Sequence, residues 1–177
     1  SPRLRQPGNR KSAMQKLSAC ILTVVLLAAA PASLLAQAAI VEPAHAQAVS
    51  EMLDAVRVAE ATLVGLEGIG AMPIPNRELF QHMRAHISKD DVIRRYVPIY
   101  ARLVSTPLAR EIAAGYQTPE GRKVAGHELA RIASLRKATA PNKLSDSDMH
   151  LVNAFNQTSA ARPFNTVHER APRALEM

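Results

Sequence analysis

The chain has 177 residues, of which 3% are aromatic and none is tryptophan, and its formal net charge is +7. This scarcity of aromatic residues, together with abundant alanine and leucine, disfavours a β-sandwich or β-barrel and favours helices. Five of the 22 basic residues lie among the first sixteen positions, which contain no acid, so 17 basic residues face 15 acidic ones from position 39 onward. We therefore expect no nucleic-acid partner.

Residues 14–38 predict a secretory signal peptide. Lys16 leads into an apolar run over 17–30, and Ala36-Gln37-Ala38 has the small-x-small pattern of a cleavage site. The uninterrupted run is shorter than the ~20 residues that a membrane-spanning helix needs. We therefore expect a periplasmic or secreted protein that meets the membrane only through this segment. Residues 1–13 are expected to be an upstream or added segment.

Two alternatives remain open for this segment. A second cleavage pattern, Ala44-His45-Ala46, would move the start of the mature chain to 46–48. Without cleavage, the segment would anchor the protein in the membrane. Cleavage would also remove Cys20, which is the one cysteine, and with it thiol catalysis, disulfides and cysteine-bound zinc.

Residues 48–72 predict an N-terminal helix that ends in a glycine-rich linker. Apolar residues recur there at spacings of three and four, and the glycines and prolines up to Pro75 then stop the helix. Residues 76–177 predict the main helical domain. Its first helix has apolar residues from Leu79 to Ile87. The next opens with a capping box, Ser88 with Asp91, and we expect Pro98 to kink it.

Hydroxyl caps before prolines predict further helix starts. Ser105 precedes Pro107, and Thr118 precedes Pro119 in a stretch where the chain would bend between two helices, a bend called an elbow below. The Thr118 hydroxyl is expected to accept a hydrogen bond from the N–H group of Gly121. Ser145 and Asp148 predict another capping box. The tail is expected to hold at most one short helix, so the fold class is an all-α compact bundle of helix–elbow–helix pairs.

An offset of 40 residues suggests a weak internal repeat. Five identities support it, namely Ser105 with Ser145, Ala114 with Ala154, Gln117 with Gln157, Thr118 with Thr158 and Arg122 with Arg162. Each copy would be a capped helix, an elbow and a second helix. Two ordinary helix pairs are the alternative, because alanine-rich helices align easily.

A set of residues between Val92 and Leu129 matches a known pattern. They are Pro98, Tyr100, Ser105, Tyr116, Thr118, Pro119, Gly121 and Lys123. The segment resembles the bacterial secreted family called domain of unknown function 2059, in which a proline and a tyrosine in one helix precede F-Y-x-S-P-x-G-x-K. Gly115 stands where phenylalanine is expected, and Leu108 where an acid is expected. The resemblance implies an exported all-helical protein of unknown activity, and it supplies no catalytic residues.

Few residues offer chemistry. His82 and His86 can share one helical face and bind a metal, but two imidazoles leave a site short of ligands, so a solvated pair is preferred. The start of a helix at Gly121, with Arg122 and Lys123, can attract an anion, although close helix packing explains the glycine more simply.

Three tyrosines, Tyr96, Tyr100 and Tyr116, are the candidate binding residues. They either fill the core or line a partly open groove near Pro98.

The expected function is therefore that of an exported, non-catalytic protein with no cofactor, which either binds a partner, such as a protein or peptide in the cell envelope, or supports the envelope itself. The identity of the partner and the oligomeric state stay open. One alternative is an unrecognised hydrolase or metal-dependent enzyme that uses His82 and His86 or a carboxylate near Tyr100. Another is a small-ligand carrier with a cavity between its helices.

Overall fold

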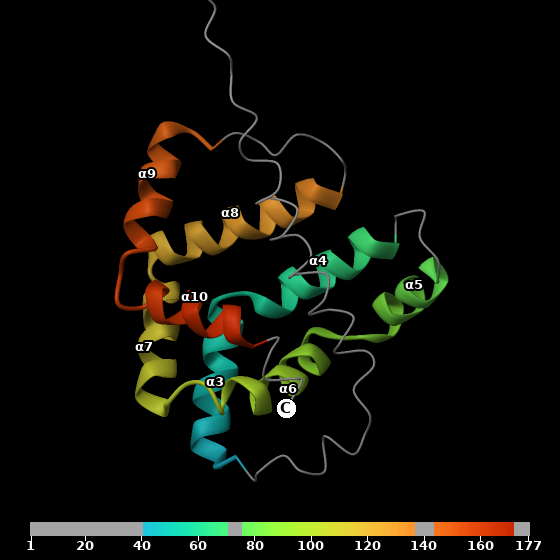
Figure 1. The fold of residues 1–177 in the computed structure, drawn as a ribbon, viewed down its shortest axis with the longest axis horizontal. Helices are drawn as coiled ribbons and strands as arrows, with labels where there is room; N and C mark the ends of the chain where they lie inside the picture. The colour runs from blue at the N-terminus through green and yellow to red at the C-terminus, as the bar shows by residue number, and fades with distance from the viewer. Residues whose placement is uncertain (1–40, 71–75, 137–143, 172–177) are drawn as a thin grey trace, which may run out of the picture.

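The computed structural model describes residues 41–70, 76–136 and 144–171, which form eight helices and no strand (Figure 1). The helices are α3 Pro43–Ala55, α4 Val58–Gly70, α5 Arg77–His86, α6 Lys89–Tyr100, α7 Thr106–Gln117, α8 Pro119–Arg136, α9 Asp146–Phe155 and α10 Ala161–Arg170. The predicted all-α fold is confirmed. None of the described helices is both long and apolar enough to cross a membrane. The predicted signal peptide lies outside the described residues.

The N-terminal helix differs from the expectation in its start and its continuity. It begins at Pro43, where proline supplies a helical φ and the first turn needs no N–H donor. It then breaks between α3 and α4 at Arg57, whose φ of 64° is left-handed. The ammonium group of Lys89 lies 2.5 Å from Asp54 and 3.2 Å from Glu60, and so joins the two sides of the break.

The core lies where α3 packs against α6 and α7. Its largest fully buried side chains come from these three helices: Tyr100, Met52, Leu53, Ile112 and Val49. Each such apolar side chain contributes roughly 1.5–3 kcal/mol relative to an exposed one. A smaller cluster around Leu66 holds α5 against α4 through Phe80 and Met83.

Hydroxyl caps begin α6 and α7 as expected. At α6, the Ser88 hydroxyl accepts from the backbone N–H of Asp91 at 3.1 Å, and the Asp91 carboxylate accepts from the backbone N–H of Ser88 at 3.0 Å. These two bonds confirm the capping box. Pro98 lies in the last turn of α6, and the Ser105 hydroxyl caps α7 by accepting from the N–H of Leu108.

The second predicted capping box forms only one of its two bonds. The N–H of Asp148 donates to the Ser145 hydroxyl at 3.1 Å. The Asp148 carboxylate instead accepts from that hydroxyl at 2.8 Å and from the ammonium group of Lys123 at 2.6 Å. The carboxylate of Asp148 therefore pairs with Lys123 of α8 and does not accept from the backbone N–H of Ser145.

His45 fastens the start of α3 to the junction between α6 and α7. Its Nε2 lies 3.0 Å from the carbonyl oxygen of Ala101, and its Nδ1 lies 2.8 Å from the Thr106 hydroxyl. Because a carbonyl oxygen only accepts, Nε2 must carry a proton, and in the neutral ring Nδ1 accepts from Thr106. The two bonds hold the first turn of α3 in place.

Candidate functional site

The first elbow joins α7 to α8 over residues 115–121. The Thr118 hydroxyl donates to the carbonyl oxygen of Gly115 at 2.8 Å and accepts from the N–H of Gly121 at 3.0 Å, which confirms the predicted cap. A Cβ atom at Gly121 would lie 2.3 Å from the Gly115 oxygen and 2.6 Å from Cα of Tyr116. Gly121 therefore lets two backbones touch. Its N–H, which an anion would need, already has an acceptor.

The second elbow joins α9 to α10 over residues 155–161 and makes corresponding bonds. The Thr158 hydroxyl donates to the carbonyl oxygen of Phe155 at 2.7 Å and accepts from the N–H of Ala161 at 3.2 Å. The internal repeat itself stays a prediction, because hydroxyl caps recur at unrelated helix starts.

The two elbows pack against each other through Gly115 and Ala160. A Cβ atom at Gly115 would lie 2.3 Å from the Cβ of Ala160, so only glycine fits there without a shift. The motif F-Y-x-S-P-x-G-x-K would place phenylalanine at this position. Glycine instead allows α10 to approach α7.

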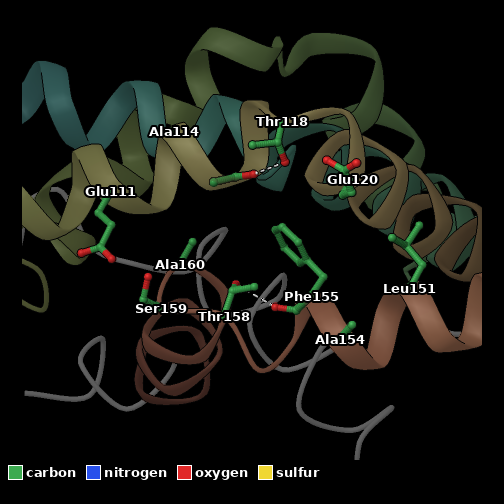
Figure 2. Close-up of a pocket in the computed structure, with 11 residues that line it drawn as sticks. Glu111, Ala114, Thr118, Glu120, Leu151, Ala154, Phe155, Thr158, Ser159 and Ala160 are labelled. Carbon is green, nitrogen blue, oxygen red and sulfur yellow. Dashed lines mark hydrogen bonds between the residues drawn. The ribbon is translucent and has the colours of Figure 1, made fainter.

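A cleft of about 610 Å³ opens between the two elbows (Figure 2). Ten of its eleven lining residues form five pairs that are 40 positions apart. The pairs are Glu111 and Leu151, Ala114 and Ala154, Gly115 and Phe155, Thr118 and Thr158, and Glu120 and Ala160, with Ser159 as the remaining residue. We call this surface the elbow cleft. The α7–α8 pair contributes one wall of it, and the α9–α10 pair contributes the other.

The two walls differ in chemistry. The α7–α8 wall carries Glu111 and Glu120, whereas the paired positions on the α9–α10 wall are Leu151 and Ala160. Figure 2 shows Glu111 at one end of the cleft and Glu120 at the other. Within the described part of the chain, no basic residue lines the cleft and neither carboxylate forms an ion pair.

The three candidate tyrosines lie in the core. Tyr96, Tyr100 and Tyr116 are 3%, 0% and 5% exposed, so they fill space instead of lining an open groove beside Pro98. Tyr116 packs edge-on against Phe155, with ring centroids 4.9 Å apart, and Phe155 lines the cleft. Tyr116 thus packs in the core against a residue that lines the cleft.

Tyr100 reaches a partner that sequence reasoning did not find. Its hydroxyl lies 2.6 Å from Nδ1 of His168, a residue 68 positions away in α10. His168 is exposed on its solvent side, but the packing of its ring against Tyr100 and Phe164 desolvates it and lowers its pKa, while burial raises the pKa of Tyr100. Both groups are therefore neutral at pH 7, and the hydroxyl donates to the imidazole. No spacing rule in the sequence connects these two residues.

Burial also raises the pKa of Tyr116, to about 12. Tyrosine in the unfolded chain ionises near pH 10 and loses its proton first, so the stability present below pH 10 is lost as the pH rises toward 12. We expect the free energy of unfolding to fall between pH 8 and pH 11 by about 1.4 kcal/mol more in the native protein than in Tyr116→Phe. Urea unfolding at the two pH values measures this difference. Equal losses in both proteins would contradict a buried hydroxyl.

His82 and His86 lie side by side on the exposed face of α5, with ring centroids 4.1 Å apart. Nδ1 of His86 lies 2.8 Å from the carbonyl oxygen of His82, so one of the four ring nitrogens is occupied. Across the described ranges, no three histidine, cysteine or acidic residues gather around a possible metal position. The structure therefore adds no third protein ligand to this pair.

Lys123 joins α8 to α9. Its ion pair with Asp148, together with the Ser145 hydroxyl, lowers the pKa of the Asp148 carboxyl. Nε2 of His127 lies 3.5 Å from the same carboxylate, but it is buried and makes no hydrogen bond among the described residues, so this contact is electrostatic only. The position that the resemblance singled out as lysine thus has a structural role here.

No protein-family model, curated protein or solved structure matches this chain.

Proposed function

We propose that this is an exported, non-catalytic helical protein that binds a protein or peptide of the cell envelope in the elbow cleft. The resemblance to the secreted family of unknown function is part of this proposal, as is export by the segment 14–38. The elbow cleft is the observation that carries it. A concave surface whose walls are held together by the close contact of Gly115 with Ala160 can hold a partner without rearrangement.

The side chains that line the cleft support binding more than catalysis. Its polar groups are two exposed carboxylates and three hydroxyls, and both threonine hydroxyls already hold backbone groups in place. Among the described lining residues, no histidine, lysine or cysteine accompanies the two carboxylates, and Figure 2 shows these carboxylates at opposite ends of the cleft instead of side by side. A hydrolase or metal-dependent enzyme receives no support from this arrangement.

The position of His45 favours cleavage after Ala38. Cleavage after Ala46 would remove the first turn of α3 and both hydrogen bonds of the His45 ring. Cleavage after Ala38 leaves them intact.

Site-specific photocrosslinking in cells tests the proposal. A photoreactive phenylalanine analogue at Ala154, which is exposed inside the cleft, is expected to capture a discrete partner. The matched control is the same analogue at Ala130, an exposed position of α8 that does not line the cleft.

The adduct at position 154 should disappear when Ala114→Arg fills the opposite wall, in a variant whose unfolding midpoint is unchanged. Equal adducts from positions 154 and 130, or none from either, would overturn the proposed function.

A further inference from the structure

We propose that the occupant of the elbow cleft is a basic, amphipathic peptide segment of the partner. Its lysine or arginine side chains would lie against Glu111 and Glu120, and its apolar side chains would lie on Leu151 and Ala154. This inference rests on the proposed function and adds the chemistry of the partner.

The charge of the cleft supports a cationic occupant. Glu111 and Glu120 are exposed, and none of the described residues that line the cleft is basic. Lys123 is paired with Asp148, and the arginines nearest in the chain, Arg110, Arg122 and Arg162, do not line the cleft. A basic segment would gain attraction at both ends of the cleft, whereas an acidic one would meet repulsion.

The opposite wall supports an apolar edge on the same segment. Positions equivalent to the two glutamates carry Leu151 and Ala160, and Ala154 and Phe155 lie between them in the chain. Phe155 and Ala160 are buried, whereas Leu151 is half-buried and Ala154 is exposed. One wall therefore offers charge, and the other offers apolar surface at Leu151 and Ala154. A peptide with basic residues along one edge and apolar residues along the other fits both walls at once.

An anionic occupant does not fit, although two helices begin beside the cleft. At α8 the N–H of Gly121 donates to Thr118, and at α10 the N–H of Ala161 donates to Thr158. Glu120 adds negative charge in the first turn of α8. These features neutralise the attraction that a helix N-terminus would otherwise exert on an anion.

Fluorescence anisotropy with three labelled heptapeptides tests the inference on the purified protein. The probes are Lys-Leu-Ala-Lys-Leu-Ala-Lys, its counterpart with glutamate in place of lysine, and its counterpart with Gly-Ser in place of Leu-Ala. We expect the first to bind most tightly, and more weakly as salt is raised. Glu111→Gln and Glu120→Gln should each weaken it about two- to fivefold.

Glu78→Gln is the matched control, because Glu78 is an exposed glutamate of α5 and does not line the cleft. It should leave the affinity unchanged. Tighter binding of the acidic peptide, equal binding of the Gly-Ser peptide, or equal effects of all three substitutions would overturn the inference. If a partner is still captured at Ala154, the proposed function survives that result. Loss of that capture would overturn both the proposed function and this inference about the peptide.

Discussion

Gly121→Ala is expected to lower the free energy of unfolding by roughly 1–3 kcal/mol. The added Cβ would lie 2.3 Å from the carbonyl oxygen of Gly115 and 2.6 Å from Cα of Tyr116. Both are backbone atoms that cannot rotate away, so α8 must shift against α7. Urea unfolding followed by circular dichroism measures the change.

Gly126→Ala is the matched control in the same helix. A Cβ at Gly126 would meet nothing within 4 Å, and alanine favours a helix interior over glycine by about 0.8–1.0 kcal/mol. We therefore expect this variant to be more stable than the native protein. A Gly121→Ala variant that gains stability as Gly126→Ala does would contradict close contact of the backbones at the first elbow.

Tyr100→Ala is expected to cost about 3–5 kcal/mol, a large part of the 5–15 kcal/mol that stabilises a typical domain. Tyr100 is 0% exposed and packs edge-on against Tyr96, with ring centroids 5.9 Å apart. Truncation would leave a cavity where α6 meets α10. Chemical unfolding at pH 7 measures the cost.

Tyr100→Phe separates the ring from the hydroxyl. It keeps the packing and removes only the hydrogen bond to His168, so about 0.5–1.5 kcal/mol should be lost. Similar unfolding midpoints for the alanine and phenylalanine variants would show that the ring contributes little, against its position in the core.

Local signals predicted most of the helices. Ser88 with Asp91 and Thr118 with Pro119 act within one helical turn, so their caps can be inferred from neighbouring residues alone. The break at Arg57 could not be inferred this way, because no glycine marks it. The ion pairs that span the break come from Lys89, far along the chain.

The cleft depends on contacts that sequence patterns do not reveal. The first elbow was predicted, but its pairing with the second elbow depends on the fit of Gly115 against Ala160. The 40-residue offset pointed to equivalent positions without indicating that they face each other. For a similar reason, the sequence did not decide whether the tyrosines fill the core or line a groove, because the partner of Tyr100 lies in the distant helix α10.

Native-state hydrogen exchange at two backbone amides tests most directly whether the paired elbows form one rigid, preformed cleft. The N–H groups of Gly121 and Ala161 donate to Thr118 and Thr158, and the elbows touch through Gly115 and Ala160. We predict that both amides are protected and open with the same free energy, within about 1 kcal/mol of core amides in α7. Rapid exchange at Ala161 beside slow exchange at Gly121 would mean that α10 detaches independently, and that no preformed cleft exists.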